Sequence, residues 1–346
     1  MNNDKVLNSY YGYYKGVLKE KSLSEEQVLS EMKDRFNNLQ DIKIAEWGRT
    51  WELKGILIPK DETHSYIIPL KTSAEIISMV DETLGENLLR EHNWVIPPYI
   101  QKRIIYDLLK KKQQNDVAGL FKETYTPAYF TSQLTSTYKN ITLFNNHLSL
   151  INEAIECFFN KHIAAAITLL LTIIEGIARE YCNQNNLSYA KKGSSSPFET
   201  VLKHGKKQWR DNVLLYNYKE RKKLIIPSDY VLDNLVRRID EAMDMFISFE
   251  TYGLDYLYKS DSDHTLNRHS ILHGINKEYF IPINFYRLFS FLEMLAVVVS
   301  LDPMPKDCKD EEAFKLFIKY ELLDELSRYT KDWKKIERLH KAFIKD

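Results

Sequence analysis

The sequence predicts a mainly α-helical protein, with a C-terminal helical bundle and an N-terminal, mostly helical region that carries a small β-hairpin. Three observations support this fold class. Only 11 glycines and 10 prolines occur in 346 residues, which leaves little room for long irregular stretches. The many leucines, lysines and glutamates favour helix. Apolar residues also recur at helical spacing over most of the chain, and a chain of this length can bury a large core.

The composition narrows the classes of function. Lys plus Arg and Asp plus Glu number 48 each, so any attraction to nucleic acid must come from local clusters. The cysteines Cys157, Cys182 and Cys308 form no CxxC pair, which favours reduced thiols over a disulfide framework. Because the N-terminus is polar and resembles no signal peptide, we expect a cytoplasmic protein. The most apolar run, residues 163–174, is about half the length of a membrane span, so we expect no membrane contact.

The N-terminal region, residues 1–140, begins with two predicted helices within residues 4–40. Ser22 and Glu25 have the spacing of a capping box, and a periodic apolar segment follows them. The second helix is therefore expected to begin at this capping box.

The pattern changes between Trp47 and Leu70. Two apolar runs, residues 53–58 and 66–70, are separated by a polar turn that contains a proline, as is typical of a β-hairpin. Pro69 cannot donate a backbone hydrogen bond, so the second strand is expected either to lie at a sheet edge or to end there. Helical patterns resume from Ser73.

The helical bundle is predicted over residues 141–305, after a boundary near 126–142 where Thr, Ser and Pro interrupt the helices. Its centre is expected to be one long helix, or two abutting helices, over residues 148–182, because this stretch is apolar on most of its circumference. An insertion follows at about 183–232. Further helices are expected at about 232–258, 268–275 and 283–302, and then at about 310–343 in a C-terminal extension, residues 306–346.

One segment concentrates groups that can hold an anion and move a proton: Asn267, Arg268, His269, His273 and Gly274. On a helix, Arg268 and His273 lie about 140° apart around the axis and about 7.5 Å along it, but a long arginine can still reach the cleft that the histidine faces. A guanidinium can hold phosphate oxygens, and an imidazole can transfer protons near neutral pH. This pair therefore suits cleavage of RNA by its own 2′-hydroxyl without a metal.

Two other interpretations of this segment stay open. An arginine and a histidine near the start of a helix often only cap or pair with their neighbours. His269 and His273 also lie four residues apart on one helix face, where Asp263 and His264 could complete a zinc site. The glutamate of an HExxH motif is missing, however, since Ser270 follows His269. No metal or other cofactor is therefore predicted.

The second informative segment is an alanine-rich apolar helix over residues 162–176. Its small residues allow another helix to approach closely, and Glu175 interrupts its apolar face with a carboxylate. Taken alone, such a glutamate is most simply a capped or salt-bridged core residue. If it lies near Arg268, it can orient the guanidinium or tune His273.

Together, these two segments resemble the HEPN superfamily, and within it proteins of bacterial defence and abortive-infection systems. The resemblance covers about residues 145–302: an alanine-rich helix that ends in Glu-Gly, a variable insertion, and Asn-Arg-His-x-Ile-x-His-Gly at the start of another helix. It implies an all-α bundle, usually a homodimer in which the motifs of two protomers face each other. It also implies that Arg268 positions the scissile phosphate, that His273 transfers protons, and that His269 helps to shape the site. Glu175 corresponds loosely to the family pattern.

The insertion carries the clearest basic cluster of the chain, with aromatic residues interleaved. Basic and aromatic residues together suit single-stranded RNA, through phosphate neutralisation and base stacking. A solvated helix face with the aromatic residues packed inward explains the pattern equally well. The candidate RNA-binding residues are Lys203, Lys206, Lys207, Arg210, Lys222 and Lys223, and the interleaved aromatic residues are Trp209, Tyr216 and Tyr218.

The sequence leads to three hypotheses. The first is a metal-independent endoribonuclease of a defence or toxin type, with RNA as substrate and a site shared by two subunits. Its N-terminal region would sense a phage-derived trigger or hold the nuclease inactive, and an antitoxin could be its partner. The second is a module of the same fold that binds RNA or a protein without cutting. The third is a metal-dependent hydrolase that uses His269 and His273.

Overall fold

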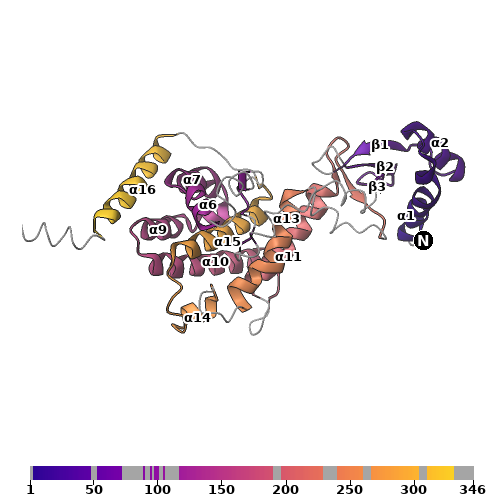
Figure 1. Cartoon of the computed structure of the whole chain (residues 1–346). Helices are drawn as coiled ribbons and strands as arrows, with labels where there is room; N and C mark the ends of the chain where they lie inside the picture. The colour runs from indigo at the N-terminus through magenta and orange to yellow at the C-terminus, as the bar shows by residue number, and fades with distance from the viewer. Residues whose placement is uncertain are drawn as a thin grey trace, which may run out of the picture. The chain divides into compact units, whose positions relative to one another are not determined.

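The computed structural model of the chain is mostly helical in the part that it describes, which confirms the mainly α fold class, and it contains one sheet (Figure 1). The chain forms two compact units, Met1–Glu82 with Lys206–Asp244 and Thr83–Gly205 with Met245–Asp346. The three domains expected from the sequence, residues 1–140, 141–305 and 306–346, were drawn from sequence patterns alone, and they stay a prediction. The described residues are 3–47, 53–71, 89, 94–95, 97–100, 104–105, 117–189, 196–228, 240–259, 266–303 and 310–330.

Both helices expected near the N-terminus are present. α1 spans Asn3–Tyr13 and continues as a π-helical turn, η1 (Tyr14–Leu18), and α2 spans Glu25–Arg35. The capping box lies two residues later than predicted, because Ser24 Oγ accepts from Gln27 N at 3.3 Å and Gln27 Oε1 accepts from Ser24 N at 2.9 Å. An N-cap residue needs extended backbone, and the prediction failed because the preceding serine, Ser22, is left-handed with a φ of 50°.

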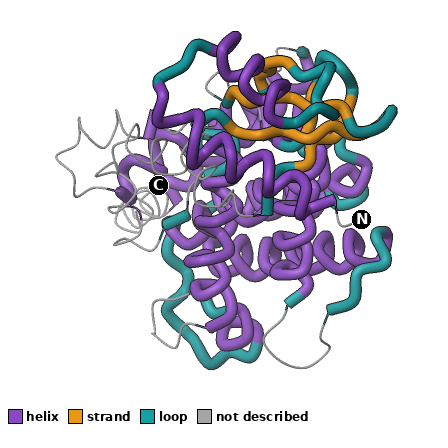
Figure 2. Tube along the Cα trace, turned by 90° about the vertical axis from the view of Figure 1, so that its right-hand side faces the viewer, coloured by secondary structure: helices purple, strands orange, loops and turns teal. Residues whose placement is uncertain are grey.

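The predicted hairpin is present, but it belongs to a larger sheet than expected (Figure 2). The strand order is β1-β2-β3-β5-β4, and β5 pairs in parallel with β3. The predicted insertion therefore supplies two strands to the sheet of the N-terminal region. The strands are β1 (Lys43–Glu46), β2 (Lys54–Pro59), β3 (His64–Pro69), β4 (Tyr216–Asn217) and β5 (Lys222–Ile225).

Pro69 is the last residue of β3, which lies inside the sheet between β2 and β5. Of the two positions predicted for this proline, the strand end is therefore correct and the sheet edge is wrong. Proline's missing N–H does no harm where the strand stops.

The second unit is built around α10 (Ile163–Gln184), which packs against α9 (Leu148–Phe159) and α15 (Pro282–Ser300) (Figure 1). Of the two alternatives for this stretch, two helices is correct. Lys161 takes a left-handed φ of 62° between α9 and α10, and this breaks the helix so that the two form a hairpin. By length and composition α15 could cross a membrane, but 78% of its most apolar stretch is buried inside the molecule.

The stretch at 126–142 was predicted to interrupt the helices, and breaks do occur at Tyr125–Thr126 and at Ile141, but helical segments cover most of it. Thr126 caps α7 by accepting from Tyr129 N at 3.3 Å, and Pro127 occupies the first turn. Thr and Pro therefore begin a helix here instead of ending one. The helical segments of this stretch are α6 (Val117–Thr124), α7 (Pro127–Ser132), η3 (Gln133–Thr137), η4 (Tyr138–Asn140) and α8 (Thr142–Asn145).

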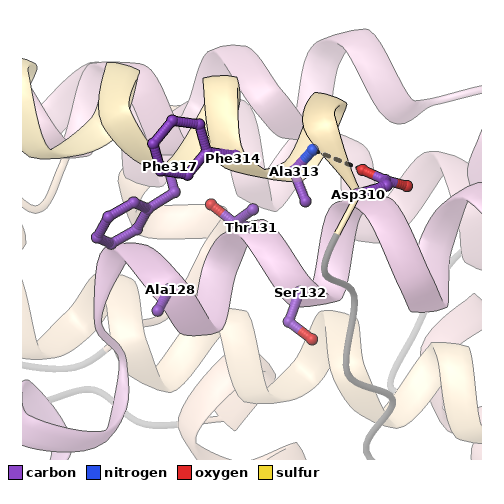
Figure 3. A pocket seen from close by; sticks show the side chains of 7 residues that line it. All are labelled: Ala128, Thr131, Ser132, Asp310, Ala313, Phe314 and Phe317. Atoms are coloured by element: carbon purple, nitrogen blue, oxygen red, sulfur yellow. Dashed lines mark hydrogen bonds between the residues drawn. The ribbon is translucent and has the colours of Figure 1, made fainter.

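The C-terminal helix α16 (Glu311–Thr330) packs against α7 and α9, and its predicted continuation to residue 343 lies outside the described residues. Asp310 Oδ1 accepts from Ala313 N at 2.8 Å and so caps its start. Figure 3 shows Phe314 and Phe317 above α7, on a pocket of about 310 Å³. This pocket lies between α7 and the first turns of α16.

The remaining helical segments lie between α10 and α15 in the sequence. The predicted helix at 232–258 is described from residue 240 onward. It runs first as the α-helix α13 and then continues as π-helical turns. Its first residues, 232–239, lie outside the described part. The segments are α11 (Pro197–Trp209), η5 (Arg210–Leu214), α13 (Glu241–Ser248), η6 (Phe249–Gly253), η7 (Asp255–Lys259) and α14 (Arg268–Leu272).

Candidate functional site

The predicted site lies on the short helix α14, which contacts α10 and η7 (Figure 1). Asn267 is its N-cap, with Oδ1 accepting from Ser270 N at 3.1 Å. Gly274 ends it with a φ of +69°, and Ile275 N donates to Ser270 O at 2.8 Å. Asn267 and Gly274 thus fix both ends of α14, as capping asparagines and left-handed glycines commonly do.

Arg268 points from α14 towards α10. Its Nε lies 3.5 Å from Oε2 of Glu175, and the two side chains are 28% and 9% exposed. This distance is too long for a strong hydrogen bond, so the contact is mainly electrostatic. Glu175 is therefore placed to orient the guanidinium of Arg268, one of the two roles expected for it.

The same carboxylate binds a second arginine. Glu175 Oε1 accepts from Arg179 Nε at 3.0 Å and from Arg179 Nη2 at 2.7 Å. One largely buried carboxylate thus holds two guanidinium groups, and the three side chains carry a net charge of +1. Such a cluster attracts a further anion, for which a phosphate group is well suited.

The sequence interpretation missed Arg179 and Tyr258. Arg179 follows Glu175 by four residues on a helix, and this spacing is a signal that could have identified it. Tyr258 lies on η7 beside Glu175 and Arg268. Burial raises the pKa of the Tyr258 phenol, and the nearby charge of Glu175 adds to this, so the hydroxyl stays neutral at physiological pH. No sequence pattern marks Tyr258.

The two histidines lie side by side on the exposed side of α14. The ring centroids of His269 and His273 are 4.3 Å apart, and both side chains are exposed. Among the described residues, the charged contact of Arg268 is with Glu175, and no contact joins it to His273. One chain therefore presents the arginine and the histidine from different sides of α14, as their spacing on a helix predicts.

A metal site finds no further support in the described residues. No three His, Cys, Asp or Glu side chains converge among them. His269 and His273 alone would offer two ligands, whereas zinc sites in proteins have three or four protein ligands. Asp263 and His264, the other candidate ligands, lie outside the described residues.

Exposed apolar side chains occur at the end of α14 and in the segment that joins it to α15. We call this the α14 apolar surface: Leu272, Ile275, Phe280 and Ile281, which are 40%, 67%, 53% and 39% exposed. Tyr279, within the same segment, is tied to α10 because its Oη lies 3.3 Å from Oγ1 of Thr168. The α14 apolar surface thus lies on a segment that is anchored to the core of the second unit.

The basic residues predicted to bind RNA lie on α11, at the start of η5 and on β5. Lys203 belongs to the second unit, where its Nζ lies 2.6 Å from Oε1 of Glu199. The other five belong to the first unit. There Arg210 pairs with Asp211 at 2.8 Å, and Lys222 Nζ donates to the backbone oxygen of Asp61 at 2.9 Å. Lys206 and Lys207 lie on α11, and Lys223 is exposed on β5.

The interleaved aromatic residues were expected either to stack on RNA bases or to pack inward, and the structure shows exposed and buried rings among them. Trp209 is 1% exposed and donates from Nε1 to Asp240 Oδ1 at 3.0 Å, so it packs inward. Tyr218 is 51% exposed, and its ring meets that of Tyr216 edge to face at 5.0 Å. Only the tyrosine pair, next to β5, is placed to stack on a base.

The chain was compared with protein families, curated proteins and solved structures. No protein-family model, no curated protein and no solved structure matches the chain. A functional interpretation therefore rests on the residues and their geometry.

Proposed function

We propose that this protein is a metal-independent endoribonuclease of the HEPN type, in which Arg268 binds the scissile phosphate and His273 transfers protons. One observation supports this most strongly. Arg268 is held by the largely buried Glu175 on α10, and the other side of α14 carries two exposed imidazoles, those of His269 and of the C-cap residue His273. Phosphodiester cleavage without a metal requires a fixed guanidinium and a proton-transfer group, and this segment supplies both kinds of side chain.

In the proposed reaction, the imidazole of His273 accepts the proton of a ribose 2′-hydroxyl. The 2′-oxygen attacks the adjacent phosphorus, the bond to the 5′-oxygen breaks, and the leaving oxygen takes up a proton. The products are a 2′,3′-cyclic phosphate and a 5′-hydroxyl. Arg268 stabilises the negative charge that grows on the phosphate oxygens, and Glu175 positions Arg268 without touching the substrate.

The proposed site is completed by a second copy of the chain. Within one chain Arg268 and His273 point away from each other, so a homodimer would let the arginine of one subunit act with the histidine of its partner. The α14 apolar surface begins next to His273 in the sequence, and a dimer would cover its exposed side chains.

A cleavage assay in excess EDTA tests the proposal. Wild type, Arg268→Ala and His273→Ala are incubated with labelled mixed-sequence RNA, and the product ends are analysed for 2′,3′-cyclic phosphate. Lys277→Ala is the matched control, because Lys277 is an exposed cation close to the site in sequence. We expect cleavage by wild type and Lys277→Ala only. Equal cleavage by all four proteins would identify a contaminating nuclease and contradict the proposal.

A module that binds RNA without cutting it is the second candidate. The exposed Tyr218, its neighbour Tyr216 and the exposed Lys223 favour this function, because they combine base-stacking rings with a cation. Filter binding of a single-stranded RNA separates the two candidates. The binding module would be supported if wild type binds the RNA without cleaving it. Tyr218→Ala and Lys223→Gln should then bind the RNA more weakly.

The proposed biological setting is cytoplasmic defence or toxicity, with an antitoxin or a phage-derived trigger acting through the N-terminal region. Expression in a bacterial host tests it. Wild type should stop growth, either directly or after phage infection, and His273→Ala should not. Growth arrest by both proteins at equal expression would separate toxicity from the proposed chemistry.

A further inference from the structure

A cavity of about 620 Å³ lies in the second unit, lined by residues of α6, α7, α9, α10, α15 and α16. None of the residues of the Arg268 site lines it. Its volume is in the range of about 300–1,000 Å³ that small-molecule sites have. The cavity is therefore large enough for a ligand of its own.

Aromatic rings form much of its wall. Tyr125, Phe158, Phe159 and Tyr286 line the cavity and are 2%, 4%, 4% and 7% exposed, so only small parts of these rings reach it. Tyr125 and Tyr286 are stacked with centroids 5.3 Å apart, and Phe158 meets Tyr286 at 5.1 Å. Phe159 is backed by Tyr320 of α16, at 5.2 Å. These contacts hold the rings in place, so this part of the wall is rigid and apolar.

Charged side chains line the rest of the cavity. Lys161 and Arg328 both bind Asp324, the latter with Nη2 at 2.7 Å from Oδ2. Burial opposes ionisation of this carboxyl, but the two cations outweigh it and lower the pKa of Asp324, so it stays ionised. Among the described residues, Lys122 has no charged partner, and Glu321 lines the cavity with an exposed carboxylate. The lining thus carries a net charge of +1.

Two long helices begin at the same cavity. Ile163 is the first residue of α10 and Pro282 the first of α15, and both line it. Neither helix has a side-chain hydrogen bond at its N-cap. The positive ends of these helices add to the charge of Lys122 and favour an anionic group in the cavity.

We propose that this cavity binds a nucleoside monophosphate. Its base packs against the aromatic wall, and its phosphate lies by Lys122 and the two helix ends. Its ribose hydroxyls donate to the carboxylate of Glu321, as carboxylates commonly accept from ribose in nucleotide sites. Each of the three parts of the ligand thus meets a matching part of the lining, and this site is independent of the proposed ribonuclease.

Isothermal titration calorimetry of the full chain with AMP tests the proposal. Adenosine provides the base and ribose without the anion, and inorganic phosphate provides the anion alone. We expect each to bind at least tenfold more weakly than AMP. Lys122→Gln should weaken AMP binding about tenfold, and Ala118→Trp, which places an indole in the cavity from an exposed position, should abolish it.

Two control variants locate the site. Lys33→Gln removes an exposed lysine in the first unit, and Arg268→Ala removes the cation of the candidate ribonuclease site. Both should bind AMP as wild type does. The proposal is overturned if AMP does not bind, if adenosine binds as tightly as AMP, or if Lys122→Gln leaves binding unchanged. The proposal is also overturned if Arg268→Ala loses AMP binding while Lys122→Gln keeps it, because AMP would then bind at the candidate ribonuclease site.

Discussion

A single carboxyl group in the core should make the stability of this protein depend strongly on pH. Glu293 lies within α15 and is 0% exposed. Tyr125 Oη donates to its Oε2 at 3.0 Å, and Tyr129 Oη donates to its Oε1. Burial raises the pKa of Glu293 to about 8, although these two hydrogen bonds act in the opposite direction. The folded protein therefore keeps a proton that the unfolded chain releases.

The sign and size of the effect follow from this difference. A carboxyl whose pKa rises on folding contributes its full stability at pH values below its unfolded pKa. That stability is lost as the pH rises towards the folded pKa. The ordinary value is 4.5 and the folded value about 8. Since one pKa unit corresponds to about 1.4 kcal/mol, the free energy of unfolding should fall by up to about 5 kcal/mol over this range.

Glu293→Gln is the perturbation, because a glutamine keeps the shape and a polar group but cannot ionise. Urea unfolding at pH 5 and pH 8 is compared for wild type, Glu293→Gln and Glu153→Gln, whose parent glutamate is exposed on α9. From pH 5 to pH 8, Glu293→Gln should gain several kcal/mol relative to wild type, and Glu153→Gln should gain almost nothing. Burial raises the pKa of Tyr125 and Tyr129, so these phenols stay neutral. A constant difference between wild type and Glu293→Gln would refute the reasoning.

Three further predictions concern packing, a helix end and the candidate site. In Gly205→Ala the new Cβ would lie 2.5 Å from a valine methyl group of α15, so the free energy of unfolding, measured in urea, should fall by about 1–3 kcal/mol. Gly16→Ala, with nothing within 4 Å, should change it by less than about 1 kcal/mol. Gly274→Ala should cost about 1 kcal/mol in the same assay, because its φ is +69°. In the proposed ribonuclease, Glu175→Gln should lower RNA cleavage at least tenfold in the EDTA assay, because Arg268 loses the carboxylate that orients it. Equal destabilisation by Gly205→Ala and Gly16→Ala would contradict the packing argument, and full cleavage by Glu175→Gln would contradict the proposed role of Glu175.

The helices that could be predicted are those with strong local patterns. α1, α2, α15 and α16 consist of residue types that favour helix, and this preference is a property of the local sequence. Local patterns failed where two neighbouring residues suit the same role. Ser22 and Ser24 are equally good caps by type, and the backbone conformation decided between them. At residues 126–142, Thr and Pro favour the start of a helix as much as a break.

Part of the candidate site could also be predicted. The sequence pointed to Arg268, His269 and His273, and it placed Glu175 near Arg268 as one alternative, which is the arrangement found. The second arginine on this carboxylate, Arg179, had a helical-spacing signal that was overlooked. Tyr258 had no signal, because its position depends on how η7 packs and not on any neighbour in sequence.

The sequence by itself determined the mainly helical fold, the hairpin of β2 and β3, and the short segment that carries the chemistry of the candidate site. These features depend on local periodicity, turn residues and residue type. Only the tertiary structure decided that β5 joins β3, that Trp209 packs inward, and that Arg268 turns to α10 while His273 stays exposed. Strand pairing uses backbone hydrogen bonds that every residue type offers, and burial depends on which distant element covers a side chain. Strand pairing and burial by a distant element therefore cannot be recognised from the neighbouring residues in the sequence.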